Sequence, residues 1–184
     1  MEYGRSRTHA SVAWYKLADL ITRKEREKAL SVYRLLSHSL EDRAYALQLE
    51  GDILWSFDDR GACEKYKQAA FLYRKEKRWI DAIAVCEHLL FLEPNNFDLL
   101  SLLVDLYAII AWQNKFSQHL GKLTDLLQKK IINDEQLLKT IKAVIDYART
   151  VEHAENCDWI YENFHALAQE SPAPLSTHIK EYLK

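Results

Sequence analysis

The fold of this chain is indicated most clearly by residues 63–96, which read CEKYKQAAFLYRKEKRWIDAIAVCEHLLFLEPNN. Small, aromatic and large apolar residues recur there at helical spacing, namely Tyr66, Ala69, Ala70 and Tyr73, then Ala82, Cys86 and Leu89, with Pro94 near the end. Residues three and four positions apart share one face of an α-helix. The segment therefore predicts two helices joined by a short turn, with Pro94 closing the second helix.

The composition of the whole chain also favours helices. The 184 residues are 48% hydrophobic and 28% charged, with four Gly and three Pro. A chain of this length can bury a large core, and so little Gly and Pro leaves few turns for β-hairpins. Three widely spaced cysteines argue against a disulfide framework and are typical of a reducing compartment. We expect one all-α domain over residues 1–184, with three buried or half-buried thiols.

Apolar residues recur at steps of three and four along most of the chain, interrupted by short polar joints, and this pattern predicts about ten helices. Asn95 and Asn96 precede one predicted helix, and Asn133 and Asp134 precede another, as helix caps do. We place one joint at Gln113–Lys115, so that the preceding helix covers Phe97–Trp112. Joints of two to five residues favour antiparallel neighbours.

A 34-residue step carries the apolar pattern of the opening segment forward. Tyr66, Ala69, Ala70 and Tyr73 map onto Leu100, Leu103, Val104 and Tyr107. A 33-residue step competes in the N-terminal part, where Trp14, Ala18, Ala29 and Tyr33 map onto Leu47, Gly51, Ala62 and Tyr66. The helix Gly61–Lys77 is the first of a pair in the 34-residue phase and the second in the 33-residue phase. We favour the 34-residue phase, because Pro94 and two Asn residues end the segment.

The segment Cys63–Asn96 resembles a tetratricopeptide repeat, a 34-residue helix–turn–helix unit with this order of aromatic, small and Pro positions. The resemblance implies a right-handed solenoid of antiparallel helix pairs whose first helices line a concave, ligand-binding groove. It also implies a non-catalytic protein-interaction module, such as an adaptor, a scaffold or a chaperone-like protein. We expect a flexible N-terminus at residues 1–10 and a capping helix at 172–184.

The predicted helix Phe97–Trp112 is apolar on every side, with Asp98 and Asp105 as its charged residues. Such a helix needs cover all round, whereas a first helix of a solenoid leaves one face open. A partner, a second copy of the chain, the C-terminal helix or an ordinary compact core could each supply that cover. We predict that Leu102, Ile109 and Trp112 contact a partner.

The 34-residue phase predicts the residues that line the groove and bind the partner: Lys67, Phe71, Arg74, Ser101, Leu102, Asp105, Ile109, Trp112 and Lys139. An apolar centre with basic flanks suits an amphipathic or acidic peptide bound as a helix in a groove. Phe71 and Asp105 stand where carboxylate-binding repeats of chaperone partners carry Asn, so we do not predict a co-chaperone of that kind. A self-associating scaffold is the alternative function.

Motifs for catalysis are missing from the sequence, since it has no glycine-rich phosphate loop, no G-x-S-x-G and no H-E-x-x-H. His153, Cys157 and His165 share a helical spacing, but two or three such residues do not make a four-ligand site. The turn at Asp58–Gly61 is interpreted as a helix cap. We expect no enzyme activity, no metal and no cofactor.

Charge and hydropathy limit the remaining classes. Residues 1–80 carry 16 Lys and Arg against 12 Asp and Glu, and residues 81–184 carry 9 against 15, while the pI is near 6.4. Acidic residues interleave with the basic clusters and weaken their attraction for phosphate, so RNA binding ranks below protein binding. No secretion signal of the usual form precedes Ser11, and no span is long and apolar enough for a membrane helix. We therefore expect a cytoplasmic protein with a protein or peptide partner, or a homodimer.

Overall fold

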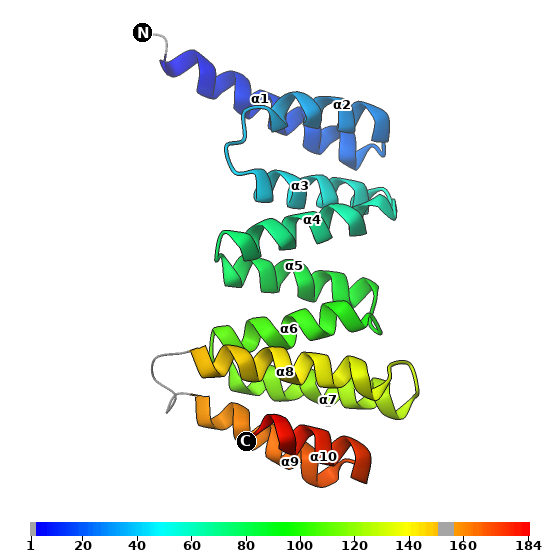
Figure 1. Cartoon of the computed structure of the whole chain (residues 1–184). Helices are drawn as coiled ribbons and strands as arrows, with labels where there is room; N and C mark the ends of the chain where they lie inside the picture. The colour runs from blue at the N-terminus through cyan, green and yellow to red at the C-terminus, as the bar shows by residue number, and fades with distance from the viewer. Residues whose placement is uncertain (1–2, 151–156) are drawn as a thin grey trace. The chain divides into compact units, whose positions relative to one another are not determined.

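The computed structural model describes residues 3–150 and 157–184, and the side chains from Val12 onward within these ranges. These residues form ten helices and no strands (Figure 1). The helices are α1 (Tyr3–Thr22), α2 (Arg26–Ser37), α3 (Arg43–Ser56), α4 (Gly61–Lys75), α5 (Trp79–Leu92), α6 (Phe97–Ile109), α7 (Gln113–Gln128), α8 (Asp134–Thr150), α9 (Asp158–Glu170) and α10 (Ala173–Tyr182). The all-α fold class and the number of helices predicted from the sequence are confirmed.

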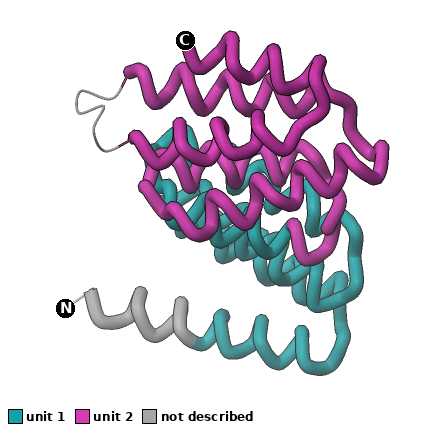
Figure 2. Tube along the Cα trace, turned by 90° about the horizontal axis from the view of Figure 1, so that it is seen from below, with its two compact units in different colours: residues 1–89 teal, residues 90–184 magenta. Residues whose placement is uncertain are grey.

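The chain divides into two compact units, residues 1–89 and 90–184, where the sequence predicts one domain (Figure 2). The boundary falls within α5. Helix α1 begins at Tyr3, inside the segment for which a flexible terminus is expected, and α10 occupies the segment expected to form a capping helix.

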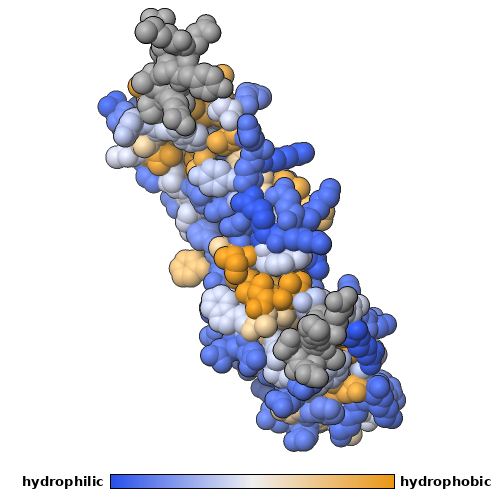
Figure 3. All heavy atoms as spheres, turned by 90° about the vertical axis from the view of Figure 1, so that its left-hand side faces the viewer, coloured by the Kyte–Doolittle hydropathy of each residue, from blue (hydrophilic) through white to orange (hydrophobic). Residues whose placement is uncertain are grey.

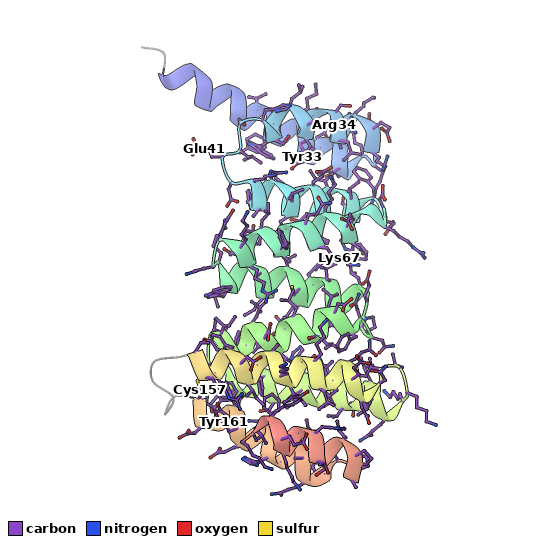
Figure 4. The ribbon with its side chains drawn as sticks, viewed as in Figure 1. Tyr33, Arg34, Glu41, Lys67, Cys157 and Tyr161 are labelled. Atoms are coloured by element: carbon purple, nitrogen blue, oxygen red, sulfur yellow. The ribbon has the colours of Figure 1, made fainter. Side chains whose placement is uncertain are left out.

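Unit 1 is built from helix hairpins. α1 packs along α2, and α3 packs along α4, while the contact between α2 and α3 is smaller. The two hairpins are joined by a hydrogen bond in which the Tyr33 hydroxyl donates to the Ala46 carbonyl (Figure 4). Burial raises the pKa of Tyr33 to about 12, with a smaller contribution from Glu50, so this hydroxyl keeps its proton and its role as a donor.

Unit 2 has its helices in two layers. α6 contacts α8, and α8 contacts α10, so these three even-numbered helices lie side by side in one layer. α7 and α9 form the other layer, and each contacts the helices that precede and follow it. Every helix in this unit therefore buries its apolar stripe against neighbours in the sequence, as the predicted helical repeat requires.

Five of the turns between helices have the same backbone geometry. Lys24, Asp58, Lys77, Ala111 and Lys130 all have a left-handed φ between 54° and 60°. At each turn the N–H of this residue donates to the carbonyl three residues earlier, and the next N–H donates to the carbonyl five residues earlier. This pair of bonds is the Schellman motif, which usually places glycine at the left-handed position. None of the five positions here is glycine.

Four of these turns form two series that share one step. The 34-residue step of the sequence separates Lys24 from Asp58, and it also separates Lys77 from Ala111. The first series relates the turns inside the hairpins α1–α2 and α3–α4, and the second relates the turns after α4 and after α6. Helix α4 therefore follows a turn of one series and precedes a turn of the other.

One predicted helix boundary is wrong. The sequence pattern extends a helix from Phe97 to Trp112 with a joint at Gln113–Lys115, whereas α6 ends at Ile109 and α7 already begins at Gln113. Ala111 adopts the left-handed conformation, and the Trp112 N–H donates to the Tyr107 carbonyl at 2.9 Å. This turn closes α6 before the apolar run of the sequence is finished.

The predicted caps and thiols agree with the structure. Asn96 accepts a hydrogen bond from the Leu99 N–H, and Asn133 accepts one from the Gln136 N–H. Asp59 accepts one from the Gly61 N–H, as its interpretation as a cap requires. Cys63 is a half-buried free thiol, and Cys86 and Cys157 are buried free thiols. Burial raises the pKa of Cys86 to about 12.

Candidate partner-binding site

The inner face of α4, which the repeat pattern identifies, is packed in the core. Tyr66, Ala69, Ala70 and Tyr73 are all at most 3% exposed. The Tyr66 hydroxyl donates to Asp52 Oδ1 at 2.8 Å, and the Tyr73 hydroxyl donates to Gln48 Oε1 at 2.8 Å, so both rings are fixed against α3. The opposite face of α4 is consequently held in a defined orientation.

That opposite face carries an exposed aromatic ring. Phe71 is 67% exposed, although it stands in the middle of a helix whose other aromatic rings are buried. It lies at a pocket of about 530 Å³, hereafter the α3–α4 pocket, which is lined by Arg43, Leu47, Glu64, Lys67, Gln68, Phe71 and Leu72. Leu47, Phe71 and Leu72 supply apolar surface, and polar side chains surround it. Figure 4 labels Lys67 on α4.

The acidic residues near the α3–α4 pocket are already engaged within the chain. Glu50 pairs with Lys65 at 3.1 Å, and Glu64 Oε1 accepts a hydrogen bond from Gln68 Nε2 at 2.8 Å. Asp42, the residue before Arg43, accepts hydrogen bonds from the Tyr45 N–H and from Arg78 Nη1, the latter at 2.6 Å. The ion pairs offset the charges of Glu50 and Asp42, while Glu64 keeps its negative charge at the pocket.

Asp42 stays ionised for a clear physical reason. Burial disfavours its carboxylate, but the hydrogen bonds from the Tyr45 N–H and Arg78 outweigh that cost and lower the pKa of Asp42. The same bond to Arg78, with one from Arg78 to Asp81, raises the pKa of Arg78. Arg78 also stacks over the Tyr73 ring, with its guanidinium carbon 4.3 Å from the ring centroid.

Two basic residues beside the pocket have no such engagement. Arg43 lines it from α3, and Lys75 lies one helical turn after Phe71 on α4. Within the described ranges, neither side chain has an ion pair or a hydrogen bond to another residue. The pocket thus combines an exposed aromatic ring with one lining cation, Arg43, that lacks a counter-ion, and Lys75 is a second such cation beside it.

The predicted residue Arg74 does not line the α3–α4 pocket. Its charge acts on Cys86 of α5, where it opposes the effect of burial on the pKa of that thiol. Of the three predicted site residues in unit 1, the structure therefore brings two together at the pocket, Lys67 and Phe71, and the third, Arg74, lies outside its lining.

The other six predicted site residues all belong to unit 2, and α8 engages two of them. Ser101 Oγ is 2.8 Å from Thr140 Oγ1, and the Tyr147 hydroxyl donates to the Ile109 carbonyl at 3.3 Å. Ser101 and Ile109 are half-buried. Helix α8 therefore supplies part of the cover that the apolar composition of α6 demands.

The remaining predicted residues have different surroundings. Leu102 and Asp105 are half-buried, and Lys139 is exposed on α8. Trp112 is 45% exposed at the turn after α6, where its ring meets the Tyr107 ring edge-on, with the centroids 5.8 Å apart. Lys115 Nζ lies 5.9 Å from the centroid of the same indole. Trp112 thus packs against the preceding helix, α6, and remains partly exposed.

A larger depression of about 940 Å³ lies in unit 2, at the turn between α7 and α8 and beside Pro172. Its lining has cations and anions together, Lys130 with Asp134 and Glu135, and none of the predicted partner-binding residues. The N-terminus of α8 beside it is already capped, since Asn133 and Gln136 exchange hydrogen bonds. Size alone favours this depression, but its chemistry does not select a ligand, so we prefer the α3–α4 pocket.

The described residues contain no group of three or more His, Cys, Asp or Glu side chains arranged to hold a metal ion. Of the residues considered as metal ligands, Cys157 is buried at the start of α9, His165 is exposed, and His153 lies outside the described residues. Burial is the main cause that raises the pKa of Cys157. None of the helices in the described ranges combines the length and apolar character needed to cross a membrane.

Sequence reasoning did not identify Arg43 and Leu47 as parts of the site. Both stand on α3, for which the 34-residue phase gives no equivalent of the strong segment. The sequence does show that they are four residues apart, a spacing that places both on one face of a helix.

Figure 3 shows that the surface on the side drawn there is largely hydrophilic, with apolar side chains exposed in small groups.

A comparison of the sequence with models of known protein families gives no match, and a comparison with curated proteins gives none either.

Proposed function

We propose that this chain is a non-catalytic protein-interaction module of the tetratricopeptide-repeat type, and that the α3–α4 pocket is its partner-binding site. The observation that carries the proposal is Phe71. A 67% exposed aromatic ring beside Leu47 and Leu72 forms an apolar surface at a pocket, where a partner side chain would be buried. Aromatic residues at the centre of a pocket are the usual anchors of protein interfaces.

The repeat type is supported by the turns and by the core. The turns after α4 and α6 have the same Schellman geometry, and one 34-residue step separates them. The four apolar positions of α4 in the opening segment are buried, and so are their equivalents in α6. A cytoplasmic location agrees with the free thiols but rests on the sequence.

Affinity capture from the native host, with identification by mass spectrometry, tests the proposal. The Phe71→Ser variant removes the exposed ring, and we expect it to lose the captured protein while its helical circular dichroism stays unchanged. Leu35→Ser is the matched control, because Leu35 is 76% exposed on α2 and does not line the pocket. Equal capture by wild type and Phe71→Ser would contradict the proposal. Light scattering after size-exclusion would show whether the captured partner is a second copy of the chain.

A further inference from the structure

We infer that the α3–α4 pocket selects a partner segment that is helical, carries an acidic face and inserts an apolar side chain beside Phe71. This inference rests on the proposed function and adds the chemistry of the partner. It follows from which charges around the pocket are neutralised within the chain and which are not.

The anions and the cations around the pocket differ in whether they are paired within the chain. Glu50 and Asp42 are paired with Lys65 and Arg78, and Glu64 is hydrogen-bonded to Gln68. The side chains of Arg43, which lines the pocket, and Lys75, one helical turn after Phe71, have no ion pair or hydrogen bond in the described ranges. A carboxylate that approaches Phe71 therefore meets positive charges that have no other counter-ion, which favours an acidic partner and opposes a basic one.

The apolar part of the pocket limits the anchor. A volume of about 530 Å³ lies in the range of pockets that enclose small ligands or side chains, about 300–1,000 Å³. Leu47 and Leu72 flank the exposed Phe71 ring, so an inserted aliphatic or aromatic side chain gains contact on several sides. The polar residues around Leu47, Phe71 and Leu72 determine where charged groups of the partner would be placed.

The described residues form no sheet edge with which a partner strand could pair. A strand added to this surface would find side chains where it needs backbone donors and acceptors. A helix satisfies its own backbone hydrogen bonds and presents apolar and acidic residues on adjacent faces. The combination of an apolar stripe with flanking carboxylates therefore fits this surface best.

The test uses the full-length chain and two designed, fluorescently labelled peptides. Both form the same amphipathic helix with one apolar stripe, and they differ in carrying Glu or Lys beside the stripe. We expect the Glu peptide to bind at about 100 μM or below and the Lys peptide to bind at least about tenfold more weakly, as followed by fluorescence anisotropy. The affinity of the Glu peptide should fall with added salt.

Charge reversal sharpens the test. In the double variant Arg43→Glu/Lys75→Glu the Glu peptide should lose at least about tenfold in affinity and the Lys peptide should gain. Lys142→Glu is the control, because Lys142 is an exposed cation on α8 outside the pocket. Circular dichroism confirms that each variant is folded.

The outcomes separate this inference from the proposed function. The acidic specificity would be overturned if the two peptides bound equally well, or if the charge reversal left the affinity of the Glu peptide unchanged. The pocket would then be an apolar site without charge preference. If neither peptide binds while Phe71→Ser still abolishes capture from the host, the partner chemistry inferred here is wrong and the proposed function stands. If Phe71→Ser has no effect on capture, the proposed function fails as well.

Discussion

Helices α4 and α6 occupy equivalent positions in the 34-residue pattern. Their inner faces are alike, since both are buried, but their outer faces differ. Tyr73 and Tyr107 are equivalent, and both are buried. On the outer face, Phe71 of α4 is exposed, whereas its equivalent in α6 is the half-buried Asp105. Helix α6, which has the more apolar sequence, is the better covered of the two, whereas the more polar α4 exposes an aromatic ring. An apolar composition on all sides of a helix therefore indicates how much cover the helix has, and it does not locate the exposed aromatic ring of the neighbouring repeat.

The turns that follow the two helices repeat the contrast. Arg78 stacks on Tyr73 after α4, and Trp112, at the equivalent position of the next repeat, packs edge-on against Tyr107 after α6. At equivalent positions, a guanidinium group thus packs on the buried tyrosine of α4 and an indole ring packs on the buried tyrosine of α6. Trp112, which the sequence assigns to a partner, also has this packing role within unit 2.

The largest expected effect separates inner from outer faces. Leu103→Ala removes a side chain that is fully buried on the inner face of α6, and it should lower the free energy of unfolding by about 2–5 kcal/mol. Phe71→Ala on the outer face of α4 should change it by no more than about 0.5 kcal/mol. Urea unfolding followed by circular dichroism measures both. Similar losses in the two variants would mean that Phe71 is a core residue and would break the comparison.

A second prediction concerns the space beside the inner face of α4. A Cβ atom added at Gly51 would lie 2.7 Å from Cε1 of Tyr66, whose hydroxyl is held by Asp52. Gly51→Ala should therefore lower the free energy of unfolding by about 1–3 kcal/mol, in spite of its better helix propensity.

Gly121 in α7 supplies the matched control, because an added Cβ there meets nothing within 4 Å. Gly121→Ala should raise the free energy of unfolding by about 0.5–1 kcal/mol. Urea unfolding of the two variants should give opposite signs. Stabilisation by both would show that the Tyr66 ring can move and that the inner face of α4 is loosely packed.

The third prediction concerns Asp42, which caps α3 and binds the arginine stacked on Tyr73. Asp42→Ala should lower the free energy of unfolding by about 1–2 kcal/mol, as expected for the loss of a cap. The pKa of Asp42 is lower in the folded chain than its ordinary value of 3.8. Its contribution is thus complete above that value and is lost as the pH falls through the lowered folded value.

Thermal unfolding of wild type and Asp42→Ala across acidic pH measures this linkage. The difference in stability between the two proteins should be constant near neutral pH and should shrink below about pH 4. A difference that grows on acidification would mean that the charged form of Asp42 does not stabilise the fold.

The smallest expected effect lies in the turns. Lys77 and Ala111 have left-handed φ values of 59° and 54°, a conformation that costs a residue with a Cβ more than it costs glycine. Lys77→Gly and Ala111→Gly should each raise the free energy of unfolding by about 0.5–1 kcal/mol. Calorimetry would detect the rise in melting temperature. A lower melting temperature in both variants would show that the extra conformational entropy of glycine in the unfolded chain outweighs the relief of strain. A lower melting temperature in only one variant would show that the two turns differ in strain.

Much of the fold could be predicted because its signals are local. Helical spacing of apolar residues predicts the all-α class. Asn96 and Asn133 indicate where helices begin, because their side chains cap the first turn. The end of α6 could not be predicted, because the left-handed residue there is Ala111 and carries no turn signal. The choice between repeat phases was also beyond the sequence, since α4 takes part in both series of turns.

The site was harder to predict than the fold for a different reason. A single repeat pattern tells which face of a helix is inward, but not which neighbour covers the other face. Of the predicted partner-binding residues, Phe71 and Lys67 line the α3–α4 pocket, while the contribution of Arg43 depends on how α3 lies along α4. The engagement of the nearby acids, such as Glu50 with Lys65, depends on tertiary geometry in the same way.

The packing of each helix on its neighbours in the sequence has a consequence for how the chain folds. Within each unit, the contacts join helices that are next to each other or two apart along the chain. Few long loops must close before a contact forms, so the entropic barrier to folding is low, as it is for helical proteins with local topology. A hairpin such as α3–α4 contains all the residues of its own pocket, so it can begin to pack as soon as it leaves the ribosome.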